Sequence, residues 1–169
     1  VVACAAHRDG EYPRFAVGSS ARLNPIVAAR SAVTEATQNW LELKRMGPEQ
    51  ATAAGGAIGE FATFPEEARS FLETRRTVAA SDVGPDDPPS GAAEMEQLLE
   101  RVTDADMTPY ATRLTPRDVA VLGFEAVRVL VPAAQPLFFD VPYFGERAER
   151  VPREMGFEPA HDRPHHPFP

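Results

Sequence analysis

Two polar side chains three residues apart, Glu35 and Gln38, lie within a stretch that the sequence predicts to be one helix, Pro25–Met46. At this spacing on a helix, the two side chains are neighbours on one face. A carboxylate beside an amide oxygen suits magnesium, which prefers a few hard oxygen ligands and keeps part of its water. The pattern therefore fits a magnesium–nucleotide site, but an ordinary polar face turned to solvent has the same appearance.

The carboxylate of the final residue, Pro169, is a second candidate functional group. The last seven residues, from Arg163 onward, include three prolines. Proline fixes φ and donates no backbone hydrogen bond, which excludes a helix or a central strand here. We expect a Pro-rich extended tail over residues 159–169, because a polyproline-like rod would hold one carboxylate in one place. A disordered terminus is the alternative interpretation of the same composition.

The composition limits what the protein binds. The formal net charge of −8 at pH 7 argues against broad binding to nucleic acid or to an anionic membrane. The single cysteine, Cys4, excludes an internal disulfide framework and fits a reduced, cytoplasmic setting. No segment reaches the length of an apolar transmembrane helix. The chain begins at Val1 with an apolar run, which we interpret as a strand in the C-terminal part of a larger domain.

The helix that carries Glu35 and Gln38 has clear sequence limits. Asn24 is a favourable N-cap before Pro25, and Gly47-Pro48 ends the helix near Met46. A helical wheel divides its residues between two faces. The expected core face contains Ile26, Ala29, Val33, Ala36, Trp40 and Leu43, and the opposite polar face contains Ser31, Glu35, Gln38, Asn39 and Glu42.

The other predicted elements indicate an α+β fold, with a mixed sheet and packed helices. Strands are expected over residues 1–6, 14–18, 110–114 and 125–131, the first of them buried and the second followed by a flexible connection over Gly18–Ala21. Further helices are expected over residues 49–60, 65–74 and 92–103 and in a short segment capped by Thr115 and ended by Gly123. Residues 81–91 form a flexible loop between them. The order strand–helix–strand over 110–131 predicts a right-handed crossover.

Four segments together resemble one protein family. Residues 28–38, with the sequence AARSAVTEATQ, are similar to the AxxRAxTEAxQ helix of YcaO-like proteins, and Gly18 to Pro25 resemble the approach to that helix. Residues 114–119 and 123–132 resemble the late helix and strand of the family, and the terminal Pro-Phe-Pro resembles its Pro-rich end. The similarity runs in order from about residue 14 to the last residue. We identify the chain as the C-terminal part of a YcaO-like domain.

The resemblance implies an enzyme that uses ATP and Mg²⁺ to phosphorylate a backbone amide oxygen of a peptide or protein, for azoline or thioamide formation. It implies that Glu35 is a magnesium ligand, that Gln38 supports the bound ATP and that the Pro169 carboxylate is a catalytic base. The implied partners are the peptide or protein substrate and a protein for substrate delivery or sulfur transfer. Whether the protein forms a homodimer is left open, and we expect it to bind neither nucleic acid nor a membrane.

Three departures from the family pattern keep a second function open. Trp40 stands where the family usually has arginine, and His165 stands where the first proline of the tail is usual. The second acidic motif of the family is absent from this sequence. The alternative is a non-catalytic YcaO-like module that binds a peptide or a partner. In either case, we expect this chain alone to be inactive.

Overall fold

The computed structural model describes residues 1–66, 69, 72–73, 76–79, 82–135, 143–159 and 161. The chain divides into two compact units, with Val1–Pro89 in the first and Ser90–Pro164 in the second. Each unit has its own antiparallel pair of strands. The α+β class is therefore confirmed, while the described sheets are two hairpins rather than one mixed sheet.

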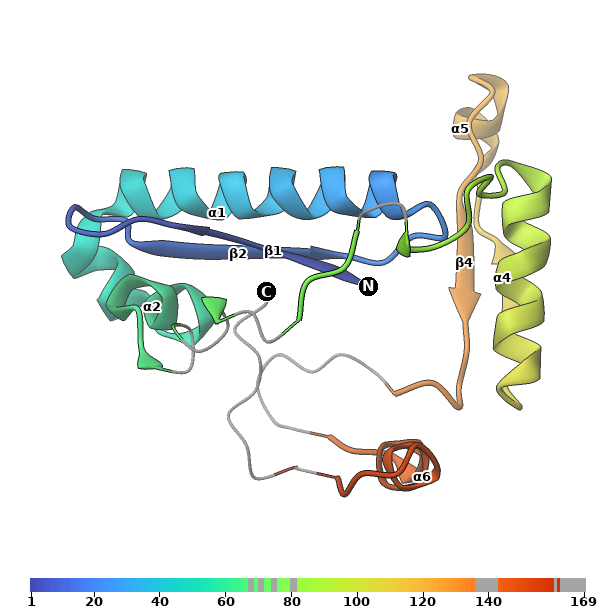
Figure 1. Cartoon of the computed structure of the whole chain (residues 1–169). Helices are drawn as coiled ribbons and strands as arrows, with labels where there is room; N and C mark the ends of the chain where they lie inside the picture. Colours follow the sequence, from blue (N-terminus) through green and yellow to red (C-terminus); the bar gives the residue numbers. More distant parts are fainter. Residues whose placement is uncertain are drawn as a thin grey trace. The chain divides into compact units, whose positions relative to one another are not determined.

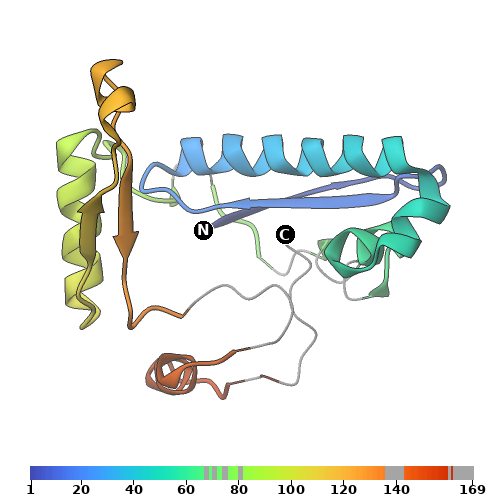
Figure 2. The same cartoon turned by 180° about the vertical axis from the view of Figure 1, so that it is seen from behind.

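The first unit is a hairpin between two helices. Strands β1 (Val2–His7) and β2 (Phe15–Ser20) pair antiparallel, with Val2 opposite Ser20 and His7 opposite Phe15. Helix α1 (Pro25–Ala54) lies along one face of this hairpin, and α2 (Gly56–Thr63) lies toward the other face (Figures 1 and 2).

Local chemistry sets the start of α1 as predicted and places a kink where the sequence predicts its end. The Asn24 side chain accepts hydrogen bonds from the backbone N–H groups of Ile26 and Val27, at 3.0 and 3.2 Å. Gly47 is not helical, with φ 76° and ψ 166°, and Pro48 follows it, so the helix kinks where the sequence predicts its end. The chain resumes helical geometry at once and continues to Ala54.

The core of the first unit lies between the hairpin and the two helices. The Phe15 ring meets the Phe61 ring edge-on, with centroids 5.6 Å apart, and stacks on Phe64 at 5.2 Å. Aromatic pairs in these geometries add to the stabilisation from burial alone. The buried residues of this cluster are Phe15, Ala16, Val17, Leu43, Ala51, Phe61 and Phe64.

The buried face of α1 is not the one that the wheel predicts. Ile26 and Val33 are 62% and 51% exposed, so their assignment to the core is wrong. A stripe of alanines at a spacing of four residues is buried instead, formed by Ala28, Ala32 and Ala36. Small side chains on this stripe let β2 approach the helix backbone closely. Of the other expected core residues, Ala36 and Leu43 are buried, while Ala29 and Trp40 are half-buried.

The strands of the first unit also differ from expectation in two details. Strand β1 is half-buried to exposed along its length, not fully buried, because only one strand pairs with it among the described residues. Strand β2 continues through Gly18, Ser19 and Ser20, so most of the predicted flexible connection is part of the sheet. This extension places the Ser19 backbone beside α1.

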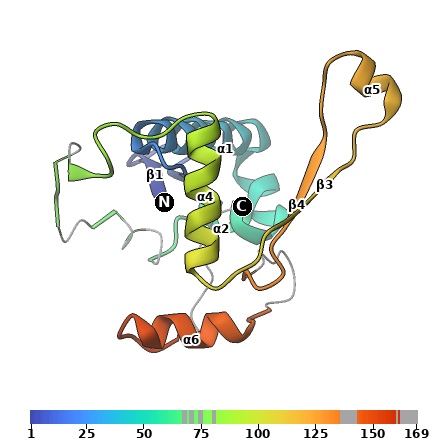
Figure 3. The ribbon, with the colours of Figure 1, turned by 90° about the vertical axis from the view of Figure 1, so that its right-hand side faces the viewer.

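The second unit contains a hairpin and two longer helices. The chain passes through α4 (Ala92–Asp104), β3 (Tyr110–Arg113), α5 (Arg117–Val121), β4 (Val127–Leu130) and α6 (Glu146–Glu154). Strands β3 and β4 pair antiparallel, with Tyr110 opposite Leu130 and Arg113 opposite Val127. Figure 3 shows α5 at the end of this hairpin, where the chain turns back.

The predicted right-handed crossover is therefore wrong. A crossover joins parallel strands through a helix long enough to return along the sheet. Helix α5 has five residues and advances about 7.5 Å, whereas a four-residue strand spans about 13 Å. Thr115 does not cap α5 either, because Pro116 occupies the N-cap position.

The Thr115 hydroxyl instead forms hydrogen bonds across the β3–β4 hairpin. It donates to Glu125 Oε2 at 2.5 Å and accepts from the Ala126 N–H at 2.9 Å. Arg113 makes a two-point contact with the same carboxylate, at 2.6 and 2.5 Å. The hydrogen bonds from Arg113 and Thr115 lower the pKa of Glu125 below its ordinary value. The Glu125 carboxylate therefore links the chain that follows α5 to the residues that precede it.

The remaining predictions divide into confirmed, missed and unplaced segments. The helix over 92–103 is confirmed, the flexibility of the loop over 81–91 stays a prediction, and Gly123 follows the end of α5 with a φ of +80°. Helix α6 was not predicted. Half of the predicted helix over 65–74 lies outside the described residues, and so does most of the tail over 159–169. Within the described part of the chain, no helix combines the length and apolar character needed to cross a membrane.

Candidate functional site

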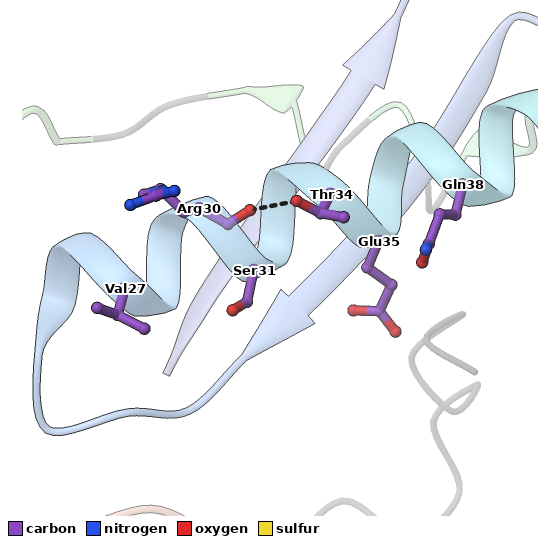
Figure 4. Close-up of a pocket in the computed structure, with 6 residues that line it drawn as sticks. All are labelled: Val27, Arg30, Ser31, Thr34, Glu35 and Gln38. Carbon is purple, nitrogen blue, oxygen red and sulfur yellow. Dashed lines mark hydrogen bonds between the residues drawn. The ribbon is translucent and has the colours of Figure 1, made fainter. Parts of the chain in front are cut away.

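A pocket of about 460 Å³ lies along one side of α1 (Figure 4). Its lining residues are Val27, Arg30, Ser31, Thr34, Glu35 and Gln38. All six come from one helix at spacings of three and four residues, so the helix alone fixes their relative positions. Glu35 and Gln38, which the sequence predicts to be neighbours on one face of the helix, line the same pocket.

The Glu35 carboxylate is held by the backbone of β2. Its Oε2 accepts a hydrogen bond from the Ser19 N–H at 2.6 Å, and the side chain is half-buried. Among the described residues, no donor contacts the other oxygen, Oε1. Figure 4 shows Ser31, Glu35 and Gln38 pointing to the same side of the helix. One oxygen is therefore used for orientation while the carboxylate still lines the pocket.

A second contact one turn later ties α1 to the same strand. The Asn39 side-chain amide donates to the Val17 carbonyl at 2.8 Å. Val17 and Ser19 are two residues apart on β2, so these groups emerge from the same edge of the strand. Because this edge faces away from β1, helix side chains satisfy backbone groups that would otherwise be unpaired.

Gly18 lies between these two contacts and makes them possible. A Cβ atom at this position would lie 2.3 Å from the Ala32 carbonyl oxygen and 2.4 Å from the Ala36 nitrogen. It would also lie 2.8 Å from the Glu35 Cβ. Only glycine permits this approach of strand and helix, and the approach brings the Ser19 N–H within reach of Glu35.

The donor set fits one side of a magnesium–phosphate site. The Glu35 carboxylate, the Ser31 hydroxyl and the Gln38 amide provide hard oxygen atoms of the kind magnesium prefers. Arg30 adds a permanent cation to the same lining, and a guanidinium group can neutralise phosphate charge. Glu35 is the pocket's sole carboxylate, and the described residues contain no cluster of three or more His, Cys, Asp or Glu side chains that could hold a metal.

The side chain of Trp40, the residue that departs from the family pattern, packs within the first unit. It is half-buried and packs against the core cluster, and the Arg8 guanidinium carbon lies 5.4 Å from the centroid of its ring. It does not line the pocket. The C-terminal residue Pro169 lies outside the described residues, so its predicted place near the site stays a prediction.

Sequence reasoning missed two groups at this site. Arg30 lies four residues before Thr34 and eight before Gln38, so a search for polar side chains at a spacing of four would have found it. Ser19 acts through its main-chain N–H, which every residue except proline carries. No sequence signal marks such a donor.

Comparisons with known proteins agree with this fold. A sequence model of the family described as YcaO cyclodehydratase, ATP- and Mg²⁺-binding, matches residues 1–135. A solved structure of a heterocyclase in complex with substrate and cofactor superposes with a TM-score of 0.72 at 22% sequence identity, over 95% of this chain. The chain covers 21% of the length of that heterocyclase. No curated protein matches the sequence.

Proposed function

Because the chain belongs to the YcaO family, we propose that it forms part of an ATP- and Mg²⁺-dependent enzyme that phosphorylates a backbone amide oxygen of a peptide or protein. Transfer of the terminal phosphoryl group of ATP to this oxygen releases ADP and activates the amide carbon for attack. Attack by a neighbouring side chain on this carbon, followed by loss of the oxygen as inorganic phosphate, would then give an azoline, and attack by an external sulfur donor with the same loss would give a thioamide. The observation that carries the proposal is the pocket on α1, where Glu35 and Gln38 face one cavity.

Each side chain of the pocket has a distinct part in this proposal. Glu35 would hold the magnesium ion, with oxygen atoms of Ser31 and Gln38 beside it, and Arg30 would face the phosphate groups. Bound magnesium supplies positive charge that offsets the charge on the phosphates. The chain's own contribution is to position these groups on a rigid helix. One carboxylate binds magnesium weakly, so the proposal requires further ligands from outside this pocket.

The proposed base is the Pro169 carboxylate. Attack on the activated amide requires that a proton leave the attacking nucleophile, and a carboxylate within hydrogen-bond reach can accept it. The prolines of the tail support this proposal because they restrict the backbone near the charge. The proposed partners are the peptide or protein substrate and a protein that delivers substrate or sulfur.

The first test measures cation binding by the complete enzyme that contains this chain, using Mn²⁺ as a paramagnetic probe in the presence and absence of ATP. We expect Glu35→Gln to weaken Mn²⁺ binding at least about tenfold, because even the loss of an outer-shell partner costs that much at metal sites. Thermal unfolding of the variant should resemble that of the wild type, since Glu35 is only half-buried.

The matched control is Glu42→Gln on the same helix. Glu42 pairs with Arg45, with 2.5 Å between Oε1 and Nη2, and does not line the pocket. This variant should bind Mn²⁺ as the wild type does. Equal Mn²⁺ binding by the Glu35 variant and the wild type would reject the magnesium role and would favour the non-catalytic binding module.

A further inference from the structure

We propose that the outer edge of β2 is a positioning element for Glu35, in which the Ser19 N–H orients the carboxylate and Asn39 holds α1 in register with the strand. This inference rests on the proposed role of Glu35 as a magnesium ligand. It adds two groups to the site, Ser19 and Asn39, that do not line the pocket.

The two oxygens of the Glu35 carboxylate differ in their contacts. The Ser19 nitrogen and Glu35 Oε2 are 2.6 Å apart, which is short for a backbone N–H hydrogen bond. Hydrogen bonds to a carboxylate are shorter than those to a neutral acceptor. The contact to Ser19 uses Oε2 and fixes the plane of the carboxylate. Among the described residues, Oε1 keeps no competing donor, so this oxygen remains available to a cation.

Both helix contacts are made on the edge of β2 that faces away from β1. Ser19 lies opposite Ala3 and Val17 lies opposite Ala5 across the β1–β2 pair. The Ser19 N–H and the Val17 carbonyl bond to helix side chains, so both groups point away from β1. Removing either helix contact therefore leaves the ladder between β1 and β2 intact.

The two contacts also fix the register of α1 along β2. Glu35 and Asn39 are four residues apart on α1, and their partners Ser19 and Val17 are two residues apart on β2. These spacings correspond to about 6 Å along a helix and about 7 Å along a strand. The two contacts match in span, so Asn39 opposes any sliding of α1 that would withdraw Glu35 from Ser19.

The test uses a pair of substitutions at one residue. Ser19→Pro removes the N–H, whereas Ser19→Ala keeps it and removes only the side chain. Proline is tolerated at a strand edge when the missing N–H faces away from the ladder. We expect Ser19→Pro to weaken Mn²⁺ binding by about 10- to 100-fold, the usual effect of losing an outer-shell partner. Ser19→Ala should bind Mn²⁺ as the wild type does.

Asn39→Ala provides an independent variant, because it leaves the backbone of β2 unchanged. It should also weaken Mn²⁺ binding, and Asn39→Asp should not restore it, since a carboxylate cannot donate to the Val17 carbonyl. Thr37→Ala, at an exposed position on the same helix, is the control. Near-wild-type unfolding temperatures in the Asn39 variants would exclude a general loss of structure.

A spectroscopic measurement identifies the hydrogen bond directly. The Ser19 amide proton should resonate far downfield in the wild type and move upfield in Glu35→Gln, because the charged acceptor is lost. Wild-type Mn²⁺ affinity in Ser19→Pro and in both Asn39 variants, with a weakened Glu35→Gln, would overturn this inference and leave the proposed function standing. Wild-type affinity in Glu35→Gln itself would overturn the proposed function.

Discussion

Replacing Gly18 by alanine is the sharpest test of the contact between β2 and α1. The added Cβ would lie 2.3 Å from the Ala32 carbonyl oxygen and 2.4 Å from the Ala36 nitrogen. A carbon–oxygen contact ordinarily stays at about 3.3 Å or more. Both obstructing atoms belong to the helix backbone, so no side-chain rotation can relieve the overlap. Strand and helix must separate by roughly 1 Å.

The expected cost follows from this geometry. Forcing extra volume into a packed interior typically costs about 1–3 kcal/mol of unfolding free energy. The Gly18→Ala variant should reach the upper part of this range, because the clash lies against main-chain atoms on two sides. For a chain of this length, 3 kcal/mol corresponds to a fall in melting temperature of roughly 6–12 °C. The same separation draws Glu35 away from the Ser19 N–H, so Mn²⁺ affinity should fall as well.

Thermal unfolding and Mn²⁺ titration measure the two effects, and Gly59→Ala provides the control. Gly59 lies inside α2, where an added Cβ would meet the Ala51 carbonyl oxygen at 3.3 Å, a tight but adjustable contact. Alanine is also the better helix former by about 1 kcal/mol. The control should melt at or above the wild-type temperature. If Gly18→Ala melts with the wild type and binds Mn²⁺ equally, the close approach of β2 and α1 is refuted.

Three further predictions test other parts of the molecule. Phe61→Ala should cost about 3–5 kcal/mol in urea unfolding, whereas Phe124→Ala, at a 66% exposed position, should stay within about 0.5 kcal/mol. Arg113 lowers the pKa of Glu125, so the stabilisation that this pair gives the β3–β4 hairpin should be present above about pH 4.3 and disappear as the pH falls through the lower folded pKa. Amide NMR across this range should show the step, and Glu125→Gln should abolish it. One residue added after Pro169 should move the terminal charge by about 3.5 Å and slow single-turnover product formation by the complete enzyme about a hundredfold, at unchanged melting temperature; wild-type rates would reject the proposed base.

Local chemistry made the start of α1 and its kink predictable. An Asn-Pro pair at the start and a Gly-Pro pair at the kink act through hydrogen bonds and dihedral limits within a few residues. Strands β3 and β4 were predictable for a similar reason, since each is a short run between turn signals. These features need no knowledge of the rest of the chain.

The buried face of α1 was not predictable in this way. The larger apolar residues Ile26 and Val33 suggest one face, and the structure buries the alanine stripe instead. Gly18 decides the outcome, because a strand without a side chain at this point can approach only a helix surface of small residues. The residue that demands small side chains on α1 is Gly18 in β2, and the helical periodicity of α1 carries no information about it.

The same difference between local and distant information decides which residues of the candidate site were predictable. Glu35 and Gln38 could be found because both lie on one helix, where spacing in sequence is distance in space. Ser19 could not, because its contribution is a backbone N–H whose position depends on Gly18 and on the register of β2. The contact that closes the core of the first unit is therefore also the contact that orients the candidate magnesium ligand. From this it follows that substitutions at Gly18 should change stability and cation binding together, whereas substitutions at the exposed Gln38 should change binding alone.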